Sequence, residues 1–384
     1  MKKIRVNLGK HSYDILICSN ELNKLGACLK RLKIGKDAVI VTNPLIKKLF
    51  GGKIKKALVS KGFTVRFEIT PDSEKAKSEK ECVRLLNNIS KFDTSCRVFI
   101  VAFGGGVVGD LAGFAASIYK RGIPYIQVPT TLLSQVDSAI GGKTAIDLST
   151  GKNLVGAFYQ PELVFSDISF LKSLPKKELA SGLAEVIKYG IIISPGLFRF
   201  IERNYKNLLA CDKKSLRRIV RECSLIKAEI VEKDERDNKN IRIILNLGHT
   251  IGHAIETGTH YNDTYNHGEA VALGIIAVTY ISQKYNLISK KDAIRIERLI
   301  GKIGLPVNLN RERNEIKNLK FRTDIVTNIL SAVEHDKKFI HGKNRFVLPV
   351  RIGEAVVKEN IPEALIKESL LQLYRPYSNV SKKR

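Results

Sequence analysis

The sequence predicts two domains, a Rossmann-like α/β domain over residues 1–167 and an all-α domain over residues 168–384. Before residue 167, short β-branched apolar runs alternate with amphipathic stretches, which is typical of a mostly parallel sheet covered by helices. After Asp167 the strand pattern fades and long segments of helical periodicity follow. A chain of 384 residues also exceeds the size at which one hydrophobic core usually keeps growing.

The strands of the first domain are expected at its apolar runs, DAVIVTNP (37–44), FTVRFEIT (63–70), RVFIVAFG (97–104), YIQVPTT (125–131) and LVFSD (163–167). Helices are expected between these strands at 43–62 and 78–91, and a helix of small residues is expected after the glycines at 104–106. In the second domain, helices are expected at 177–193, 213–234, 248–258, 267–285 and 291–304.

The chain is strongly basic, with 65 Lys and Arg against 38 Asp and Glu and a net charge of +27. Such an excess of positive charge is typical of nucleic-acid-binding proteins. Here, however, the basic residues are spread along the chain without a helix-turn-helix, zinc-finger or RRM signature. We therefore expect no nucleic-acid partner, and we interpret the charge as a solvated surface that partly attracts an anionic substrate.

The amino terminus has no apolar segment of the kind found in signal peptides, and no run of eighteen apolar residues occurs. The six cysteines are scattered without a CxxC pair, which favours reduced thiols over zinc ligands or a disulfide framework. These features predict a cytoplasmic protein with no membrane partner.

A glycine turn follows the expected strand at 97–104. Gly104, Gly106 and Gly109 match GxGxxG, a pattern in which backbone amides and a helix N-terminus approach a pyrophosphate. The strand before and the helix after the turn support this interpretation. Tight packing of a strand-to-helix turn is the alternative, and no acidic residue stands in the usual place about twenty residues later.

The segment from Arg121 to Pro161 carries further polar residues in glycine-rich loops. Gly142-Lys143-Thr144 resembles the end of a Walker A loop, but Asp137 stands where that motif requires glycine, so an NTPase is excluded. Hydroxyl, amide and ammonium donors around one carboxylate suit a polyhydroxylated anion, and a solvated polar loop is the alternative. The residues concerned are Thr130, Thr131, Asp137, Lys143, Lys152 and Asn153.

Three of the seven histidines, His249, His253 and His267, lie within nineteen residues. On a helix His249 and His253 share one face, which suits a metal or anion site as well as a pair of structural histidines. The segment is not the HExxH protease motif, because Thr250 occupies the glutamate position.

Glu185 and Lys188 lie one turn apart in an apolar stretch. They form either a surface ion pair or, through Glu185 and the histidines, part of a three-ligand zinc site with an open position.

Long motifs together resemble the 3-dehydroquinate synthase family of sugar-phosphate cyclases, over about Pro71 to Leu348. They are GGGVVGDLAGFAAS, RGIPYIQVPTTLLSQVDSAIGGKTAID, GKNLVGAFYQP, LAEVIKYG, KAEIVEKDERD, LNLGHTIGHAIE, HGEAVALG and HDKK, in this order. The resemblance implies an N-terminal NAD-binding domain, a helical metal- and substrate-binding domain and a homodimer.

The family pattern implies that Glu185, His249 and His267 bind zinc, with cobalt as a possible substitute. His253 would then face the substrate phosphate. Residues implied to contact NAD are Asn43, Glu74, Lys75, Gly104, Gly105, Gly106, Val107, Val108, Gly109, Asp110, Thr130, Thr131, Lys143 and Lys152. Catalytic residues implied are Asp137, Lys143, Lys188, Lys227, Arg242, Asn246 and His253, and substrate-binding residues are Asn153, Lys337 and Arg121, the last in the neighbouring subunit's site.

The implied activity converts 3-deoxy-D-arabino-heptulosonate 7-phosphate, a phosphorylated sugar acid, to 3-dehydroquinate and phosphate in the shikimate pathway. The steps are a transient oxidation by NAD, phosphate elimination, reduction, ring opening and aldol closure. The alternatives are another sugar-phosphate cyclase and a polyol dehydrogenase of the glycerol dehydrogenase type. The chain departs from the family at Asn43, where many members carry aspartate, and in a longer segment between His253 and His267.

Overall fold

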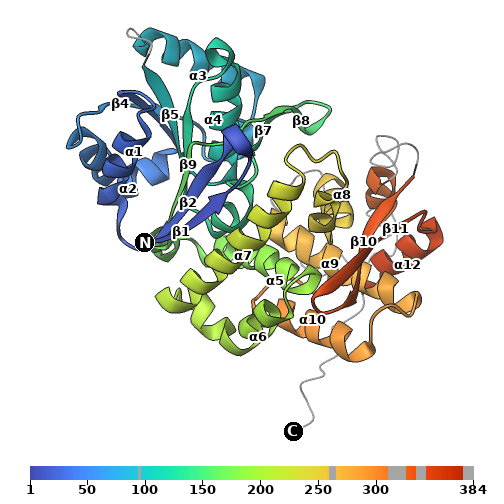
Figure 1. The fold of residues 1–384 in the computed structure, drawn as a ribbon. Helices are drawn as coiled ribbons and strands as arrows, with labels where there is room; N and C mark the ends of the chain where they lie inside the picture. Colours follow the sequence, from blue (N-terminus) through green and yellow to red (C-terminus); the bar gives the residue numbers. More distant parts are fainter. Residues whose placement is uncertain (94–96, 259–264, 310–325, 334–342, 375–384) are drawn as a thin grey trace. The chain divides into compact units, whose positions relative to one another are not determined.

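The computed structural model describes residues 1–93, 97–258, 265–309, 326–333 and 343–374 (Figure 1). The chain forms two compact units. Unit 1 comprises Met1–Leu179 and Cys211–Asn238, and unit 2 comprises Ala180–Ala210 and Lys239–Arg384. Each unit thus contains two separate segments, which a single boundary at residue 167 does not describe.

Unit 1 is built on a seven-stranded sheet in the order β1-β2-β9-β6-β5-β3-β4. Only β1 and β2 pair antiparallel, and every other neighbouring pair is parallel. The five expected strands are confirmed as β3 Asp37–Thr42, β4 Thr64–Ile69, β5 Val98–Gly104, β6 Tyr125–Pro129 and β9 Leu163–Asp167. The hairpin of β1 Lys2–Val6 and β2 Tyr13–Cys18 was not expected, because it precedes the strand–helix alternation.

Both faces of this sheet are covered by helices, which explains why its inner strands β3, β5, β6 and β9 are buried almost throughout. Successive side chains of β3 alternate between two cores, Ala38 and Ile40 in one and Val39 and Val41 in the other. The first core lies under α1 Leu25–Leu32 and α2 Pro44–Val59, and the second under α3 Glu79–Phe92 and α4 Gly106–Ile118 (Figure 1).

The helix α7 Lys213–Lys233 also belongs to unit 1, although its sequence lies in the expected second domain. Its buried face includes Leu216, Ile219 and Cys223, and the helix packs against β1 and β2.

The expected glycine-rich loops after residue 142 are instead an antiparallel hairpin of β7 Lys143–Leu148 and β8 Gly151–Phe158. Ala145 and Ile146 are buried, which anchors β7 to the unit. Gly156 allows the two backbones to approach closely, since a Cβ there would lie 2.3 Å from the Thr144 carbonyl oxygen. Before this hairpin a π-helical turn spans Ser134–Ser138, a form of helix that is frequent at functional sites.

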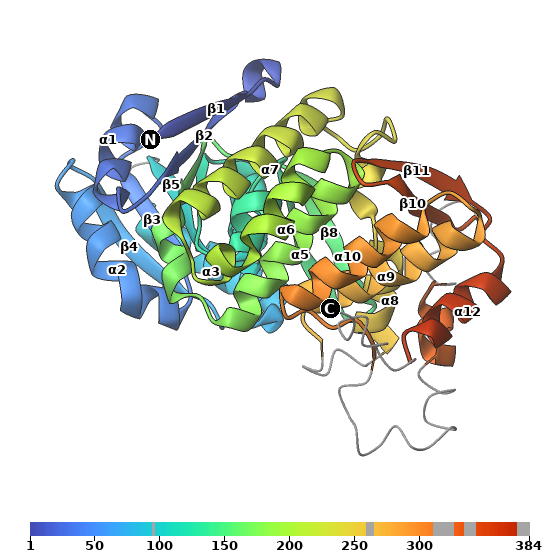
Figure 2. The same cartoon turned by 90° about the horizontal axis from the view of Figure 1, so that it is seen from below.

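Unit 2 is mostly helical, as expected. Its described helices are α5 Lys176–Ile192, which begins in unit 1, α6 Pro195–Leu209, α8 His249–Gly258, α9 His267–Lys284, α10 Lys290–Lys302 and α12 Glu363–Gln372. Helices α5, α6, α9 and α10 lie together in this unit (Figure 2). The all-α expectation missed an antiparallel hairpin of β10 Arg345–Arg351 and β11 Glu354–Glu359, which turns at Gly353 with φ +100°.

Among the described helices, none is both long enough and apolar enough to cross a membrane.

Candidate active site

Three helices of unit 2 position the predicted metal ligands. Glu185 lies within α5, and His249 and His267 are the first residues of α8 and α9. Glycines let these helices approach backbone to backbone. A Cβ on Gly274 of α9 would lie 2.0 Å from the Gly248 carbonyl oxygen, and one on Gly268 would lie 2.3 Å from the Ser181 carbonyl oxygen of α5.

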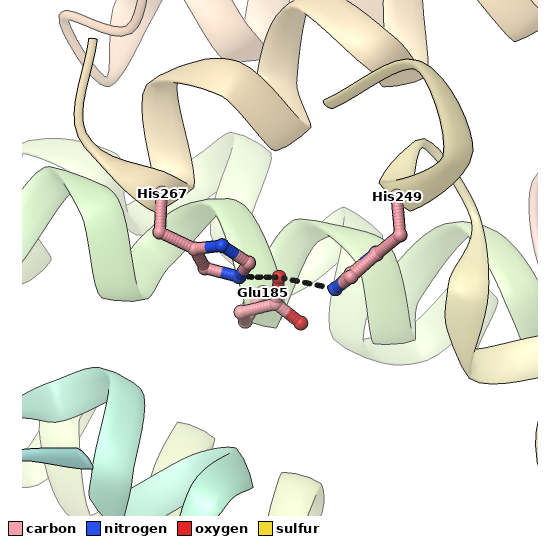
Figure 3. Close-up of side chains that lie close together, drawn as sticks. All are labelled: Glu185, His249 and His267. Atoms are coloured by element: carbon pink, nitrogen blue, oxygen red, sulfur yellow. Dashed lines mark ion pairs between the residues drawn. The ribbon is translucent and has the colours of Figure 1, made fainter. Parts of the chain in front are cut away.

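The three side chains converge on one point (Figure 3). The Nε2 atoms of His249 and His267 lie 3.6 Å and 3.7 Å from Oε1 of Glu185. One potential ligand atom from each residue falls within 4.8 Å of the others. Two imidazole nitrogens and one carboxylate oxygen form the three-ligand donor set of a catalytic zinc ion with an open coordination position, so these residues fit such a metal.

The charges around this point are buried. Glu185 and Lys188, one turn apart on α5, are 0% and 1% exposed and form an ion pair. Burial, reinforced by the Lys188 charge, lowers the pKa of His249 to about 3, so its ring is neutral at physiological pH, as metal ligation requires. Burial would also lower the pKa of His267, but hydrogen bonding and attraction to the Glu185 and Glu256 carboxylates outweigh it and raise that pKa to about 10, so metal binding at this ring must displace a proton.

His253, the second member of the HxxxH pair, lies one turn after His249 on α8 and is exposed. Its ring centroid is 5.4 Å from that of His249 and 6.0 Å from that of His267. It can contribute to a second group of potential ligand atoms, with Glu256 and His267, but not to the Glu185 group. The three histidine rings therefore lie close together, but only His249 and His267 present a nitrogen to Glu185.

Arg242 and Asn246 begin and end the short 3-10 turn that leads into α8. Arg242 is buried and Asn246 is exposed. The predicted substrate residue Lys337 lies outside the described residues.

In unit 1 the glycine turn joins β5 to α4 as predicted. Gly104 ends β5, Gly105 is the N-cap of α4 without a side-chain cap, and Gly106 begins the helix. A Cβ would lie 2.7 Å from Val108 if added to Gly104, and 3.1 Å from Thr131 if added to Gly105. The turn thus combines the close packing of the alternative interpretation with a helix N-terminus suited to a phosphate group.

A buried lysine beside this turn escaped the sequence interpretation. Lys77 Nζ lies 2.9 Å from Asp110 Oδ2 and 3.7 Å from Glu74 Oε1, and it also donates to Asn153 Oδ1. The predicted Lys75 is exposed and forms no part of this cluster. A short 3-10 turn at Glu74–Ala76 directs Lys77 inward, and no pattern in the sequence distinguished it from Lys75.

Two further predicted residues of unit 1 are paired by α7 and the segment that follows it. Lys227 Nζ donates to Asp137 Oδ1 at 2.6 Å and to the Asp137 carbonyl oxygen at 2.7 Å. Lys143, the first residue of β7, pairs with Asp237.

The remaining predicted residues of unit 1 differ in burial and in their hydrogen bonds. Thr130 is buried and its backbone N–H donates to the Gly104 carbonyl oxygen, while the Thr131 hydroxyl bonds the Ser134 hydroxyl. Lys152 lies half-buried on β8, and Arg121 is exposed with φ +64°.

Asn43 caps α2 by accepting a hydrogen bond from the Ile46 N–H at 2.8 Å. Its amide donates to Asp72 Oδ1 at 2.5 Å. A carboxylate therefore stands beside the position at which the chain departs from the family pattern.

Two family models match consecutive parts of the chain. The model described as 3-dehydroquinate synthase N-terminal matches residues 67–181, and the one described as 3-dehydroquinate synthase C-terminal matches residues 182–339. Curated 3-dehydroquinate synthases are similar over nearly the whole length. The protein of Desulforamulus reducens is 42% identical over 97% of this chain and 100% of its own, and that of Thermodesulfovibrio yellowstonii is 43% identical over 96% and 99%.

The chain belongs to the 3-dehydroquinate synthase family.

Solved structures of other cyclases share the fold of this family member. A 2-deoxy-scyllo-inosose synthase complexed with carbaglucose-6-phosphate, NAD+ and Co2+ is 25% identical with a TM-score of 0.84, covering 97% of this chain and 99% of its own. ValA, a 2-epi-5-epi-valiolone synthase from Streptomyces hygroscopicus with NAD+ and Zn2+ bound, is 22% identical with a TM-score of 0.83 over 96% and 98%.

Glycerol dehydrogenase from Schizosaccharomyces pombe resembles this member of the 3-dehydroquinate synthase family more distantly. It is 18% identical with a TM-score of 0.67, covering 94% of this chain and 88% of its own. The likeness extends to the fold alone.

Proposed function

We propose that this chain converts 3-deoxy-D-arabino-heptulosonate 7-phosphate to 3-dehydroquinate and inorganic phosphate, as a phosphate-eliminating lyase of the shikimate pathway and aromatic amino-acid biosynthesis. Full-length identity of 42–43% to curated 3-dehydroquinate synthases carries this proposal. The convergence of Glu185, His249 and His267 in the helical unit supports it.

The proposal includes two cofactors. Glu185, His249 and His267 would hold zinc or cobalt, and the turn from Gly104 to Asp110 would hold NAD+, with the other predicted cofactor residues assisting. The 2-deoxy-scyllo-inosose synthase with NAD+ and Co2+ supports this assignment. When bound, the metal polarises an alcohol or ketone oxygen and the nicotinamide accepts and returns a hydride.

The protein side chains would bind and orient the substrate. Its phosphate carries two negative charges and its carboxylate one, and charge-assisted hydrogen bonds from Lys, Arg and His are the strongest means of holding them. We assign this role to Lys188, Lys227, Arg242, Asn246, His253 and Lys337, with Lys143 and Asn153. Orientation of an open-chain intermediate before its ring closes is itself a catalytic contribution.

The family resemblance assigns His253 to the substrate phosphate, and its exposed position one helical turn from His249 is compatible with that role. Asp137 would orient the Lys227 ammonium, which it already binds at 2.6 Å. Lys188 would balance the Glu185 carboxylate next to the metal.

Several features of the proposal concern the molecule as a whole. We propose a cytoplasmic homodimer in which Arg121 reaches the phosphate site of the neighbouring subunit. We also propose a preference for NAD over NADP, since Asp72 supplies a carboxylate beside Asn43, and Asn43 follows β3, the strand that pairs in parallel with β5. A carboxylate in this region binds ribose hydroxyls and disfavours a 2′-phosphate.

One assay tests the proposed activity against its alternatives. The purified protein is incubated with the heptulosonate phosphate and catalytic NAD+, and phosphate release, carbocycle formation and net NADH are followed together. We expect equal amounts of phosphate and carbocycle and no net NADH. Net NADH would indicate a polyol dehydrogenase, and turnover only with a sugar phosphate that lacks the carboxylate would indicate another cyclase.

A further inference from the structure

The His267 ring lies between two carboxylates. Its Nε2 atom is 3.7 Å from Glu185 Oε1, and its Nδ1 atom is 3.8 Å from Glu256 Oε2. Figure 3 shows one ring nitrogen turned toward Glu185 and the other turned away from it. Glu256 is not among the residues that the family pattern assigned.

Glu256 reaches this position through the periodicity of α8. His249, His253 and Glu256 are spaced i, i+4 and i+7, so one helix face presents all three. The close approach of Gly252 on this helix to Ala270 of α9, at 3.2 Å for an added Cβ, keeps this face near the N-terminal turn that carries His267. The Glu256 side chain is only 11% exposed, so solvent screens its charge weakly.

A neutral imidazole carries one N–H and one lone pair, and the partner of the N–H decides which nitrogen can bind a metal. Metal ligation through Nε2 of His267 requires the proton on Nδ1. A carboxylate facing Nδ1 stabilises that tautomer, fixes the plane of the ring and makes the metal-binding nitrogen more basic.

We propose that Glu256 is a positioning residue of the metal centre. Its carboxylate faces Nδ1 of His267 at 3.8 Å and would close to accept the Nδ1–H when the ion binds, thereby holding Nε2 toward the ion. This inference rests on the proposed metal site. His253, Glu256 and His267 also place ligand atoms within 4.8 Å of one another, which suggests a second ion as the competing interpretation. A second ion would require the His267 ring to bridge two metals and lose both of its protons, whereas a hydrogen bond requires only the neutral ring.

Metal affinity provides the test. Metal-free wild-type protein and the variants Glu256→Ala and Glu256→Gln are titrated with Co2+, and the dissociation constant, the stoichiometry and the cobalt absorption spectrum are recorded. Removing a carboxylate behind a metal-binding histidine weakens metal affinity by about 10–100-fold, which we expect for Glu256→Ala. Glu256→Gln should lie between this variant and the wild type, because its amide oxygen still accepts the hydrogen bond without the charge.

The matched control is Glu202→Gln. Glu202 lies on α6 and pairs with Arg295 at 2.7 Å, so its replacement removes a carboxylate from unit 2 without touching the histidines. We expect wild-type Co2+ affinity for this control. Far-UV circular dichroism and thermal unfolding of the metal-free proteins establish that each variant is folded, and Glu256→Gln alone serves as the test if Glu256→Ala does not fold.

Wild-type affinity and spectrum in the folded Glu256 variants would overturn the inference. Two Co2+ ions per wild-type chain, falling to one in Glu256→Ala, would also overturn it by making Glu256 a ligand. The readout is independent of turnover. Wild-type protein that binds Co2+ in a Glu256-dependent way but releases no phosphate from the heptulosonate phosphate would support the inference and contradict the proposed function.

Discussion

At the scale of single residues, burial and charge give the clustered histidines different properties. The His249 side chain is 13% exposed and its pKa is lowered to about 3, first by desolvation and then by Lys188, whereas His253 one turn later is exposed. Spacing alone predicts only that the two share a helix face. Spacing does not predict the contacts of Glu185 with His249 and His267, and these contacts support separate proposed roles for His249 and His253.

We therefore predict opposite effects for two alanine variants. His249→Ala should lose a metal ligand and weaken Zn2+ affinity by more than about 100-fold, which exceeds the usual effect of a residue behind a ligand. His253→Ala should retain Zn2+ but lower turnover by about 100-fold, the lower range for a positioned acid, base or cation. Metal content by mass spectrometry and phosphate release measure the two effects. Equal loss of zinc in both variants would contradict this division.

A second residue prediction concerns Asp110. Burial raises its pKa to about 6 against the opposing attraction of Lys77, so the folded protein binds a proton more tightly there than the unfolded chain does. Between about pH 4 and pH 6 the free energy of unfolding should therefore fall as pH rises, and this group should contribute about 3 kcal/mol to the fall.

Asp110→Asn removes this titration while also losing the ion pair with Lys77. The free energy of unfolding of the wild type should fall through this group as pH rises, and that of the variant should not. The difference, variant minus wild type, should therefore increase between pH 4 and pH 7. Chemical denaturation at several pH values measures the difference between the two proteins. A difference that does not change with pH would contradict the raised pKa.

At the scale of elements, backbone contacts between helices bring the proposed metal ligands together. Neither α8 nor α9 carries a complete ligand set, and the glycines at their interface decide how closely the two approach. Their boundaries were predictable from helical periodicity and from the Asn266 cap of α9 with its Glu269 capping box. Their mutual distance was not predictable from either sequence segment alone.

Gly274→Ala should therefore disturb the site without touching a ligand. The added Cβ would lie 2.0 Å from the Gly248 carbonyl oxygen, so α9 must shift away from α8. We expect a loss of about 1–3 kcal/mol of stability, typical of overpacking, together with weaker Co2+ binding.

The control is Gly196→Ala on α6, where an added Cβ would meet only the Ser194 hydroxyl at 3.9 Å. This change should leave stability and metal affinity near wild type or slightly raise stability. Thermal unfolding and Co2+ titration compare the two variants. Equal behaviour of both would mean that the α8–α9 contact does not control the metal centre.

At the scale of the whole molecule, the proposed homodimer requires residues from two chains. Arg121 is exposed and has the left-handed backbone conformation, so its side chain is displayed on a turn of unit 1. If it serves the neighbouring subunit's site, a chain that lacks Arg121 is rescued by a partner that retains it.

Mixing Arg121→Ala with His253→Ala tests this arrangement, because each variant alone should be nearly inactive. In a symmetric dimer with free exchange, half of the dimers are mixed and one of their two sites is intact, so the mixture should recover about one quarter of wild-type activity. Phosphate release before and after subunit exchange measures the recovery. No recovery in a mixture shown to contain mixed dimers would place Arg121 in its own subunit's site.

Much of the fold and the site followed from the sequence for local reasons. The strands β3, β5, β6 and β9 are apolar runs buried on both faces, and β4 is a short, partly buried run at the edge of the sheet. The glycine turn lies between a strand and a helix, so neighbouring residues alone predicted these elements. The proposed metal ligands followed from family motifs, each of which is contiguous in sequence.

Only the tertiary structure decided the features that depend on distant contacts. It placed α7 with the sheet, turned an expected loop into the β7–β8 hairpin, and added β10–β11 to a unit expected to be all helical. It also directed Lys77 rather than Lys75 toward Asp110, and Glu256 toward His267. The sequence by itself determined the elements and the family, because local periodicity and contiguous motifs encode them. The partners of buried charges were decided by packing between segments that are remote in the chain.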